Sequence, residues 1–331
     1  MKKFTFIVGI ALALSLLAAC AMPAPMRNAP AATEYAAAPA ENYVDGAMPL
    51  EPDTEWNTEE YSAEEENRFK STTASPLSTF AADVDTASYA NIRRKILAGE
   101  VPEPDSVRIE EMLNYFSYDY PAPAVGEPFS VTTEMTDCPW NSANKLLLIG
   151  LQADDIDAQA LPASNLVFLL DVSGSMDDAN KLPLMKRAFL LLAAQLRPED
   201  RVSIVTYASD DRVVLEGVDG TRRTKVMSAI ENLTAGGSTA GSKGIETAYE
   251  LAERYFISGG NNRVILGTDG DLNIGVTSEG DLKRLIENKR DSGISLSVMG
   301  FGDGNLKDNK LETLADNGNG NYSYIDDVSE A

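Results

Sequence analysis

A short oxygen-rich segment follows a fully apolar run in this sequence. Residues 166–170 are Leu-Val-Phe-Leu-Leu, and residues 171–176 are Asp-Val-Ser-Gly-Ser-Met. If the apolar run is a buried strand and the chain turns sharply after it, the carboxylate of Asp171 and the hydroxyls of Ser173 and Ser175 can face one point. Hard oxygen ligands on a tight loop suit a hard divalent cation, above all Mg²⁺. These residue types therefore indicate a metal-binding loop.

Two later segments supply the same kinds of atom. Residues 236–241 are Gly-Gly-Ser-Thr-Ala-Gly and offer the hydroxyl of Thr239 in a glycine-rich loop. Residues 264–271 are Val-Ile-Leu-Gly-Thr-Asp-Gly-Asp, a second apolar strand that ends at the carboxylate of Asp269. In open parallel sheets, ligands bind beyond the carboxyl ends of the strands, which is where both aspartates are expected.

Together and in this order, the three segments resemble the metal-ion-dependent adhesion site of a von Willebrand factor type A domain. That family's pattern is D-x-S-x-S, then a threonine and later an aspartate, and no position here departs from it. The resemblance covers residues 164–327, about half of the chain. It implies Mg²⁺ as cofactor, with Mn²⁺ or Ca²⁺ as alternatives, and an open position that an Asp or Glu of a protein partner fills. The implied ligand set is Asp171, Ser173, Ser175, Thr239 and Asp269, the two aspartates bonding through waters.

Each of these residues also has a purely structural interpretation. Asp171 and Ser173 could cap the following helix, since their side chains accept hydrogen bonds from free backbone N–H groups. Thr239 could cap a later helix, and Asp269 could be an ordinary turn residue before a glycine. The coincidence of three loops favours the metal site. We interpret Met176 as a packing residue.

Three other functions compete with adhesion. The glycine segment at 236–243 superficially resembles a phosphate loop, but Ser242 stands where lysine is required, so no nucleotide is expected. A Mg²⁺-dependent phosphohydrolase is an alternative, although Ser173 replaces the second aspartate of aspartyl-phosphate enzymes and no lysine is obviously placed to neutralise a phosphoryl group. A structural envelope protein whose metal serves only rigidity is the other alternative. We expect a binding protein and no enzyme.

Composition excludes several classes of function. The chain has 331 residues, with 28 Lys plus Arg, 51 Asp plus Glu, no His and a formal charge of −23. So acidic a surface repels nucleic acid, and no basic stripe offsets it. Without histidine, the chain cannot hold a His-dependent catalytic triad or a His-ligated zinc ion.

The amino terminus indicates export. A basic start precedes an apolar stretch at residues 4–17, and residues 17–20 are Leu-Ala-Ala-Cys. This pattern is typical of a secretory leader, and it resembles the lipobox of bacterial lipoproteins. The resemblance implies a lipid anchor on Cys20 and a place in the bacterial cell envelope, at the outer membrane if the organism has one. A plain signal peptide is the alternative. Cys138 then has no partner, and we expect it in a packed turn without a catalytic role.

Four segments divide the chain. Residues 1–20 are the expected signal peptide with its lipobox, and residues 21–75, rich in Ala, Pro, Glu and Asn, are an expected disordered tether. Residues 76–163 form an expected smaller α+β domain, and residues 164–331 the type A domain. Proteins of the bacterial lipoprotein group that this chain resembles continue into a further domain, so we expect a carboxy-terminal domain beyond residue 331.

The smaller domain should contain two helices and two strands. One helix follows Asp85 and stops at Gly99, a second opens at Pro104, and strand-like runs occupy 129–134 and 145–152. Residues 80–89 (Phe-Ala-Ala-Asp-Val-Asp-Thr-Ala-Ser-Tyr) and 107–116 (Val-Arg-Ile-Glu-Glu-Met-Leu-Asn-Tyr-Phe) resemble the segment that precedes the A domain in bacterial YfbK-like lipoproteins. Asp83 and Asp85 could suggest a second metal site, but helix capping is favoured.

From residue 165 onward, strand and helix patterns alternate. Such alternation predicts an α/β fold, a doubly wound, Rossmann-like, mostly parallel sheet with helices on both faces. The expected strands are 166–170, 202–207, 264–266, 294–301 and 321–325, and the expected helices are 181–196, 222–233, 242–256, 281–289 and 307–315.

Overall fold

The computed structural model of the chain describes residues 57–63, 67–79, 82, 84–154, 160–237, 243–270 and 279–331. The expected signal peptide with Cys20, most of the expected tether, Asp83 and Thr239 lie outside these residues. Within the described ranges, no helix is long and apolar enough to cross a membrane.

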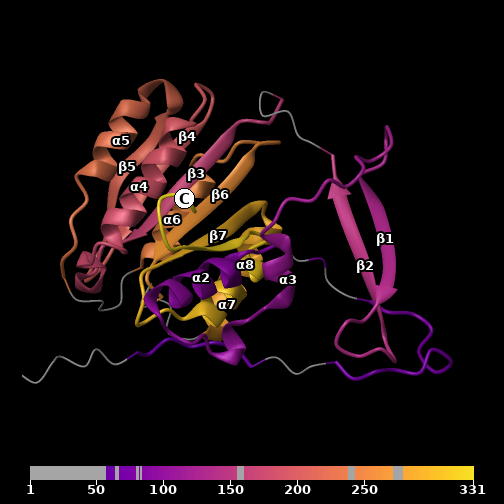
Figure 1. Ribbon diagram of the computed structural model, residues 1–331. Coiled ribbons are helices and arrows are strands. Elements are labelled where there is room, and N and C mark those ends of the chain that lie inside the picture. The colour runs from indigo at the N-terminus through magenta and orange to yellow at the C-terminus, as the bar shows by residue number, and fades with distance from the viewer. Residues whose placement is uncertain are drawn as a thin grey trace, which may run out of the picture. The chain divides into compact units, whose positions relative to one another are not determined.

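A six-stranded sheet organises the second half of the chain (Figure 1). Its strand order is β5-β4-β3-β6-β7-β8, and every neighbouring pair is parallel except the antiparallel pair of β4 and β5. The mostly parallel α/β sheet expected from the sequence is thereby confirmed. The strands are β3 (Ser164–Asp171), β4 (Arg201–Tyr207), β5 (Asp211–Asp219), β6 (Asn261–Thr268), β7 (Ile294–Phe301) and β8 (Tyr322–Ile325).

The central strand β3 reads as a continuous apolar run because both of its faces are covered. Every residue of β3 after Ser164 is buried. Asp171 lies opposite Tyr207 of β4, and Leu170 lies opposite Gly267 of β6. The carboxyl ends of β3, β4 and β6 therefore share one edge of the sheet.

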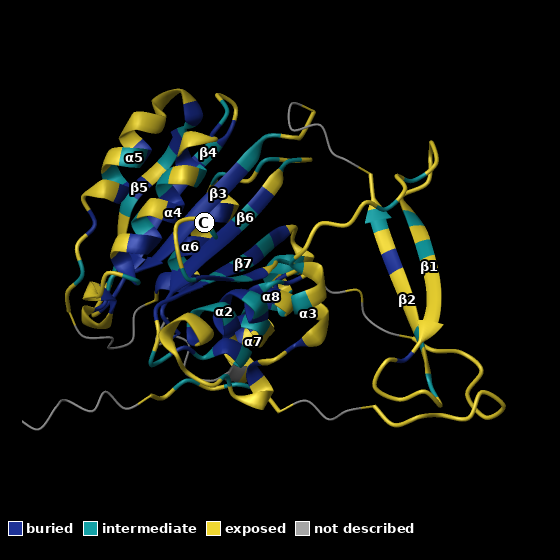
Figure 2. Cartoon of the chain, viewed as in Figure 1, coloured by how far each residue is buried: buried dark blue, intermediate teal, exposed yellow. Residues whose placement is uncertain are grey.

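Helices cover both faces of this sheet (Figure 2). The helices α4 (Leu182–Ala194) and α5 (Arg223–Glu231) pack on one face around Phe168 and Phe189. The opposite face packs against α6 (Gly244–Arg254), α7 (Glu279–Asp291) and α8 (Asp308–Asn317), with Ala87 and Ala90 of an earlier helix in the same core. Each face of the sheet thus has its own apolar core, as expected for a doubly wound fold.

The edge strand β5 was not predicted from the sequence. Its residues are mostly half-buried or exposed, and polar residues stand at both ends, so its apolar run is short. Gly217 has a φ of 55°, and the pairing of β4 with β5 shifts register along its length. Such an irregular edge strand leaves only a weak alternating pattern in the sequence.

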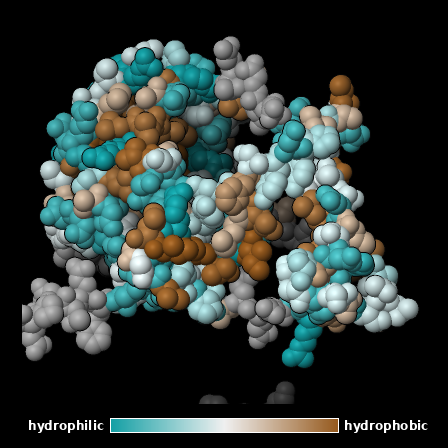
Figure 3. Space-filling view, viewed as in Figure 1, coloured by the Kyte–Doolittle hydropathy of each residue, from teal (hydrophilic) through white to brown (hydrophobic). Residues whose placement is uncertain are grey.

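The first helix of the smaller region, α2 (Ala87–Ala98), ends at Gly99 in the left-handed conformation, as predicted. The second expected helix is interrupted: a 3₁₀ turn, η1 (Pro104–Ser106), precedes a short helix, α3 (Ile109–Asn114). The apolar side chains of Ile109 and Leu113 are exposed. Hydrophobic side chains accordingly gather at the surface over α2 and α3 (Figure 3).

A buried polar junction explains why the apolar side of α3 faces outward. Arg108 and Glu111 are buried, form an ion pair, and the Arg108 guanidinium also pairs with Asp308 at the start of α8. Nearby, Asp85 accepts a hydrogen bond from the backbone N–H of Tyr322 over 3.1 Å. The N-cap of α2 is Thr86, whose side chain makes no capping bond, so Asp85 ties α2 to β8.

A β-hairpin, β1 (Phe129–Asp137) and β2 (Lys145–Ala153), lies between these helices and β3 in the sequence. Val131 faces Leu151 and Met135 faces Leu147 across the antiparallel pair, so these side chains share one face of the hairpin. All four are exposed. Cys138, just after β1, is buried and has no disulfide partner among the described residues, which agrees with a packed turn.

Residues 58–60, here called the strap, pack on a loop near the end of β7. The backbone N–H of Thr58 donates to the carbonyl of Gly304 over 2.7 Å, and that of Glu60 donates to the carbonyl of Leu306 over 2.9 Å. The carboxylate of Glu59 accepts from the backbone N–H of Gly304 over 3.0 Å. These residues fall within the segment expected to be a tether, and these bonds attach them to the body.

Candidate metal centre

Asp171 is the last residue of β3, and its side chain is completely buried. One carboxylate oxygen, Oδ1, accepts a hydrogen bond from the backbone N–H of Ser173 over 2.9 Å. The other, Oδ2, accepts from the hydroxyl of Thr268 on the neighbouring strand β6 over 3.3 Å. The carboxylate is therefore oriented by its own loop and by the adjacent strand.

The two serines lie on the turn that follows. The hydroxyls of Ser173 and Ser175 are 3.1 Å apart, and Ser173 is buried while Ser175 is exposed. Ser173 is the N-cap of a 3₁₀ turn, η2 (Gly174–Asp177), but its side chain makes no capping bond. The capping interpretation therefore does not account for this hydroxyl. Met176 is buried in the core beside α4, which agrees with a packing role.

The glycine-rich loop approaches the serine turn through its backbone. Gly236 donates from its N–H to the carbonyl of Val172 over 2.9 Å, and Gly174 donates to the carbonyl of Gly237 over 3.1 Å. Gly237 has a φ of 87°, and a Cβ there would lie 2.8 Å from the hydroxyl of Ser209. The described part of this loop is thus fixed beside Ser173, and Thr239 follows it outside the described residues.

Asp269 directly follows β6 and is also completely buried. Its Oδ2 lies 3.1 Å from the ammonium nitrogen of Lys181, which precedes α4. The next residue, Gly270, has a φ of 111°, and a Cβ there would lie 2.6 Å from the backbone nitrogen of Lys307. The turn after Asp269 is therefore closely covered by the loop that ends at α8.

Lys181 is the residue that sequence reasoning missed. The sequence showed no lysine obviously placed to neutralise a phosphoryl group. In the structure the buried ammonium nitrogen of Lys181 lies 3.1 Å from Oδ2 of Asp269 and 3.3 Å from Oδ1 of Asn305. One signal was present in the sequence. A lysine before the first turn of a helix is electrostatically unfavourable there, since that end of a helix carries partial positive charge.

The donor set fits a hard divalent cation. Four of the five expected ligands are described, and Asp171, Ser173 and Asp269 are buried at one edge of the sheet. Burial raises the pKa of the Asp171 carboxyl to about 6, and the negative charge of Asp269 acts in the same direction. A cation between them would offset both effects. Among the described residues no cluster of three or more Asp, Glu, Cys or His side chains has metal-binding geometry.

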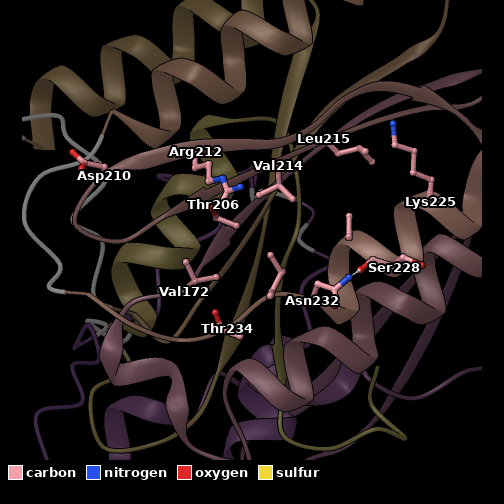
Figure 4. Close-up of a pocket in the computed structure, with 12 residues that line it drawn as sticks. Val172, Thr206, Asp210, Arg212, Val214, Leu215, Lys225, Ser228, Asn232 and Thr234 are labelled. Carbon is pink, nitrogen blue, oxygen red and sulfur yellow. Dashed lines mark hydrogen bonds between the residues drawn. The ribbon is translucent and has the colours of Figure 1, made fainter.

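A cavity of about 600 Å³ opens beside this loop, between β4, β5 and α5 (Figure 4). Val172, which lies between Asp171 and Ser173, lines it, together with Thr206, Arg212, Val214 and Lys225. Neither Asp171 nor Asp269 lines the cavity. It is adjacent to the candidate centre and separate from it.

Two family models and several known proteins match parts of this chain. The family model for the von Willebrand factor type A domain matches residues 165–331, and a model described as von Willebrand factor matches residues 55–148. The uncharacterized protein YfbK of Escherichia coli K12 is 43% identical over 281 residues, which is 83% of this chain and 49% of that protein. The uncharacterized protein sll0103 of Synechocystis is 31% identical over 199 residues, covering 58% of this chain and 44% of that protein.

This chain thus spans about half the length of the curated relatives it matches. Among solved structures, a von Willebrand factor type A protein from Catenulispora acidiphila aligns with a TM-score of 0.42 at 22% identity, covering 56% of this chain and 42% of that one. The conserved hypothetical protein BatB from Bacteroides thetaiotaomicron aligns with a TM-score of 0.41 at 20% identity, covering 50% of this chain and 91% of that one.

Proposed function

Since this chain belongs to the von Willebrand factor type A domain family, we propose that it binds a protein partner through a divalent cation held at the ends of β3 and β6. The observation that carries the proposal is the burial of Asp171 and Asp269 at one sheet edge, with the paired hydroxyls of Ser173 and Ser175 beside Asp171. Mg²⁺ is the preferred cation, with Mn²⁺ and Ca²⁺ as alternatives.

The residues of the site favour an acidic ligand. Ser173, Ser175 and, from the sequence pattern, Thr239 would contribute neutral hydroxyls, so they cancel little of the charge of the cation. A bound Mg²⁺ would supply an electrophilic position for one carboxylate oxygen of the partner. An Asp or Glu side chain on a protein surface is therefore the expected ligand.

The acidic composition of the chain is compatible with this partner. Although the formal charge is −23, exposed charges are screened beyond a Debye length of about 8 Å at physiological ionic strength. The local field of the cation then governs the approach of one carboxylate. The same composition opposes binding of nucleic acid, and nothing in the described site suggests a nucleotide.

Calorimetric titration of the full chain with Mg²⁺ tests the cation site. We expect saturable binding by the wild type and none by Asp171→Ala, because that substitution removes a buried carboxylate at the centre. Asp177→Ala is the matched control, since Asp177 is an exposed aspartate of the same turn. Equal binding by wild type and Asp171→Ala would reject the site.

The partner is tested by capture from the native envelope on immobilised chain. We expect capture in Mg²⁺, loss of capture in a chelator, and loss with Asp171→Ala. A protein retained equally under all three conditions would bind elsewhere on the surface. A phosphatase panel in Mg²⁺ should show no activity, because we propose binding and not catalysis. Turnover that Asp171→Ala abolishes would favour the phosphohydrolase instead.

We also propose that Cys20 carries a lipid and holds the protein at the cell envelope. The support is the sequence at residues 4–20, a basic apolar leader ending in Leu-Ala-Ala-Cys. Labelling of cells with a fatty-acid analogue should mark the wild type and Cys138→Ala but not Cys20→Ala. Label that persists in Cys20→Ala would disprove the anchor.

A further inference from the structure

We propose that Lys181 sets the charge of the candidate cation site, so that the bound cation keeps enough positive charge to attract an acidic ligand. This inference rests on the proposed function and assigns a positioning role to a residue outside the expected ligand set. It predicts that loss of the lysine charge strengthens cation binding and weakens binding of a carboxylate to the loaded site.

The ammonium of Lys181 is fixed against one of the two site carboxylates. Its nitrogen lies 3.1 Å from Oδ2 of Asp269 and 3.3 Å from Oδ1 of Asn305. The side chain of Lys181 is 8% exposed and that of Asp269 is 0% exposed. A third neighbour, Asp178, lies 3.9 Å away but is 70% exposed, so solvent weakens its attraction.

The fold makes room for this side chain. A Cβ on Gly302 would lie 2.5 Å from Cγ of Lys181, so the lysine stem occupies the space that a side chain at position 302 would need. Lys181 also stands at the N-cap of α4, where a positive charge is unfavourable. Its placement there is explained by Asp269 and Asn305 and not by the helix.

The charges of the site determine whether loss of the Lys181 charge strengthens or weakens binding of the cation and of a carboxylate. Asp171 and Asp269 together carry two negative charges when ionised, the serine hydroxyls carry none, and Lys181 adds one positive charge. A divalent cation then leaves the site with a net positive charge that a carboxylate can neutralise. Without Lys181 the loaded site would be neutral. In a buried site with low effective dielectric, one such charge changes binding by about tenfold or more.

The test uses the full chain with Mn²⁺ as a paramagnetic probe and acetate as the smallest carboxylate ligand. Electron paramagnetic resonance of free Mn²⁺ measures cation affinity, and relaxation of water protons measures the displacement of bound water by acetate. Lys181→Met and Lys181→Gln should bind Mn²⁺ about tenfold more tightly and acetate about tenfold more weakly than the wild type. Lys181→Arg, which keeps the charge, should resemble the wild type. Lys283→Met, which removes an exposed lysine on α7, is the control for net charge.

The two affinities separate a charge effect from a structural one. If both neutral variants lose affinity for Mn²⁺ and acetate together, Lys181 is structural and the inference is overturned. If the wild type binds Mn²⁺ and both neutral variants have the same affinities for Mn²⁺ and acetate as the wild type, the inference fails while the proposed function stands. If neither the wild type nor any variant binds Mn²⁺, both fail. Binding of Mn²⁺ by Lys181→Met alone would also overturn the inference, since the ammonium would then exclude the cation and the wild-type site would never be loaded.

Discussion

The hydroxyl of Thr268 donates a hydrogen bond to Oδ2 of Asp171 over 3.3 Å, which joins the carboxyl ends of β6 and β3 at the candidate metal centre. Thr268 is completely buried and directly precedes Asp269. One strand end therefore orients the carboxylate of its neighbour while it supplies the second carboxylate. Thr268 therefore links the end of β6 to the carboxylate of Asp171.

Replacement of Thr268 should weaken cation binding without removing a ligand. Thr268→Val keeps the shape of the side chain but loses the bond that orients Asp171, and losses of this kind typically cost about 10–100-fold in metal affinity. Calorimetric titration with Mg²⁺ measures the change. Thr313→Val is the control, because Thr313 bonds only within α8 at an exposed position. Unchanged Mg²⁺ affinity in Thr268→Val would show that the bond does not position Asp171.

Removal of the Arg108 charge should destabilise the fold. Arg108 is buried between Glu111 and Asp308, so Arg108→Met leaves two buried carboxylates without their cation. Breaking a buried pair in this way typically costs about 3–5 kcal/mol. Urea denaturation measures the loss. Arg222→Ala removes an exposed arginine that pairs with Asp219 and should change stability little. A loss in Arg108→Met no larger than in this control would contradict the prediction.

Glu312 should make stability fall as pH rises. Burial raises the pKa of its carboxyl from 4.5 to about 8, the negative charges of Glu111, Asp308 and Asp316 act in the same direction, and Arg108 opposes them. Between these two values the folded chain keeps a proton that the unfolded chain has lost, so this group lowers the free energy of unfolding as pH increases. Below 4.5 both states are protonated and the group has no effect.

Glu312→Gln removes this titration. We expect stability close to wild type at pH 4 and a gain of about 1–3 kcal/mol at pH 9, measured by urea denaturation. Glu287→Gln on α7 is the control, because Glu287 pairs weakly with Lys283 at 3.9 Å near the surface. If Glu312→Gln raises the free energy of unfolding equally at pH 4 and pH 9, the burial of a charged Glu312 is not the cause of the increase.

Gly270→Ala should lower the free energy of unfolding by more than the strain of a positive φ alone would. The residue has a φ of 111°, and a Cβ would lie 2.6 Å from the nitrogen of Lys307 and 2.8 Å from the carbonyl oxygen of Asn305. Gly259 also has a positive φ, 73°, but a Cβ there meets nothing within 4 Å. Gly259→Ala should therefore cost about 1 kcal/mol from backbone strain alone.

The comparison between the two glycines isolates the steric effect. In thermal denaturation we expect Gly270→Ala to be clearly less stable than Gly259→Ala. Mg²⁺ binding should weaken only in Gly270→Ala, because Gly270 directly follows Asp269 and strain there displaces that carboxylate. Equal losses of stability in the two variants would show that residues 305–307 move aside without lowering the free energy of unfolding.

The central strands could be predicted from sequence because their residues face apolar cores on both sides. β3, β4, β6 and β7 are runs in which most residues are buried, and each appeared as an apolar segment. The edge strand β5 did not, since one irregular strand at the border buries few side chains. The second helix of the smaller region was expected to open at Pro104, but the structure has a separate 3₁₀ turn there before α3. The buried side of this segment is formed by Arg108 and Glu111, so its apolar residues gave a misleading pattern.

The site could be predicted in part for a similar reason. Asp171, Ser173 and Ser175 lie within five residues of each other, so a local pattern reveals them. Lys181 and Asp269 are separated by 88 positions, and only the fold brings the ammonium to the carboxylate. A charged residue buried through such a distant contact leaves no periodic signal. The metal itself, Thr239 and the partner's carboxylate stay predictions.

The strap connects the loop beside the candidate metal centre to the amino-terminal side of the chain. Thr58 and Glu60 run parallel to residues 304–307 and share backbone hydrogen bonds with them. A force that pulls on the chain ahead of the strap would load these bonds together in shear, and the load would pass to the loop that holds Asn305 beside Lys181. Tension along the chain would thereby reach the candidate site through the backbone, by way of Asn305 and Lys181.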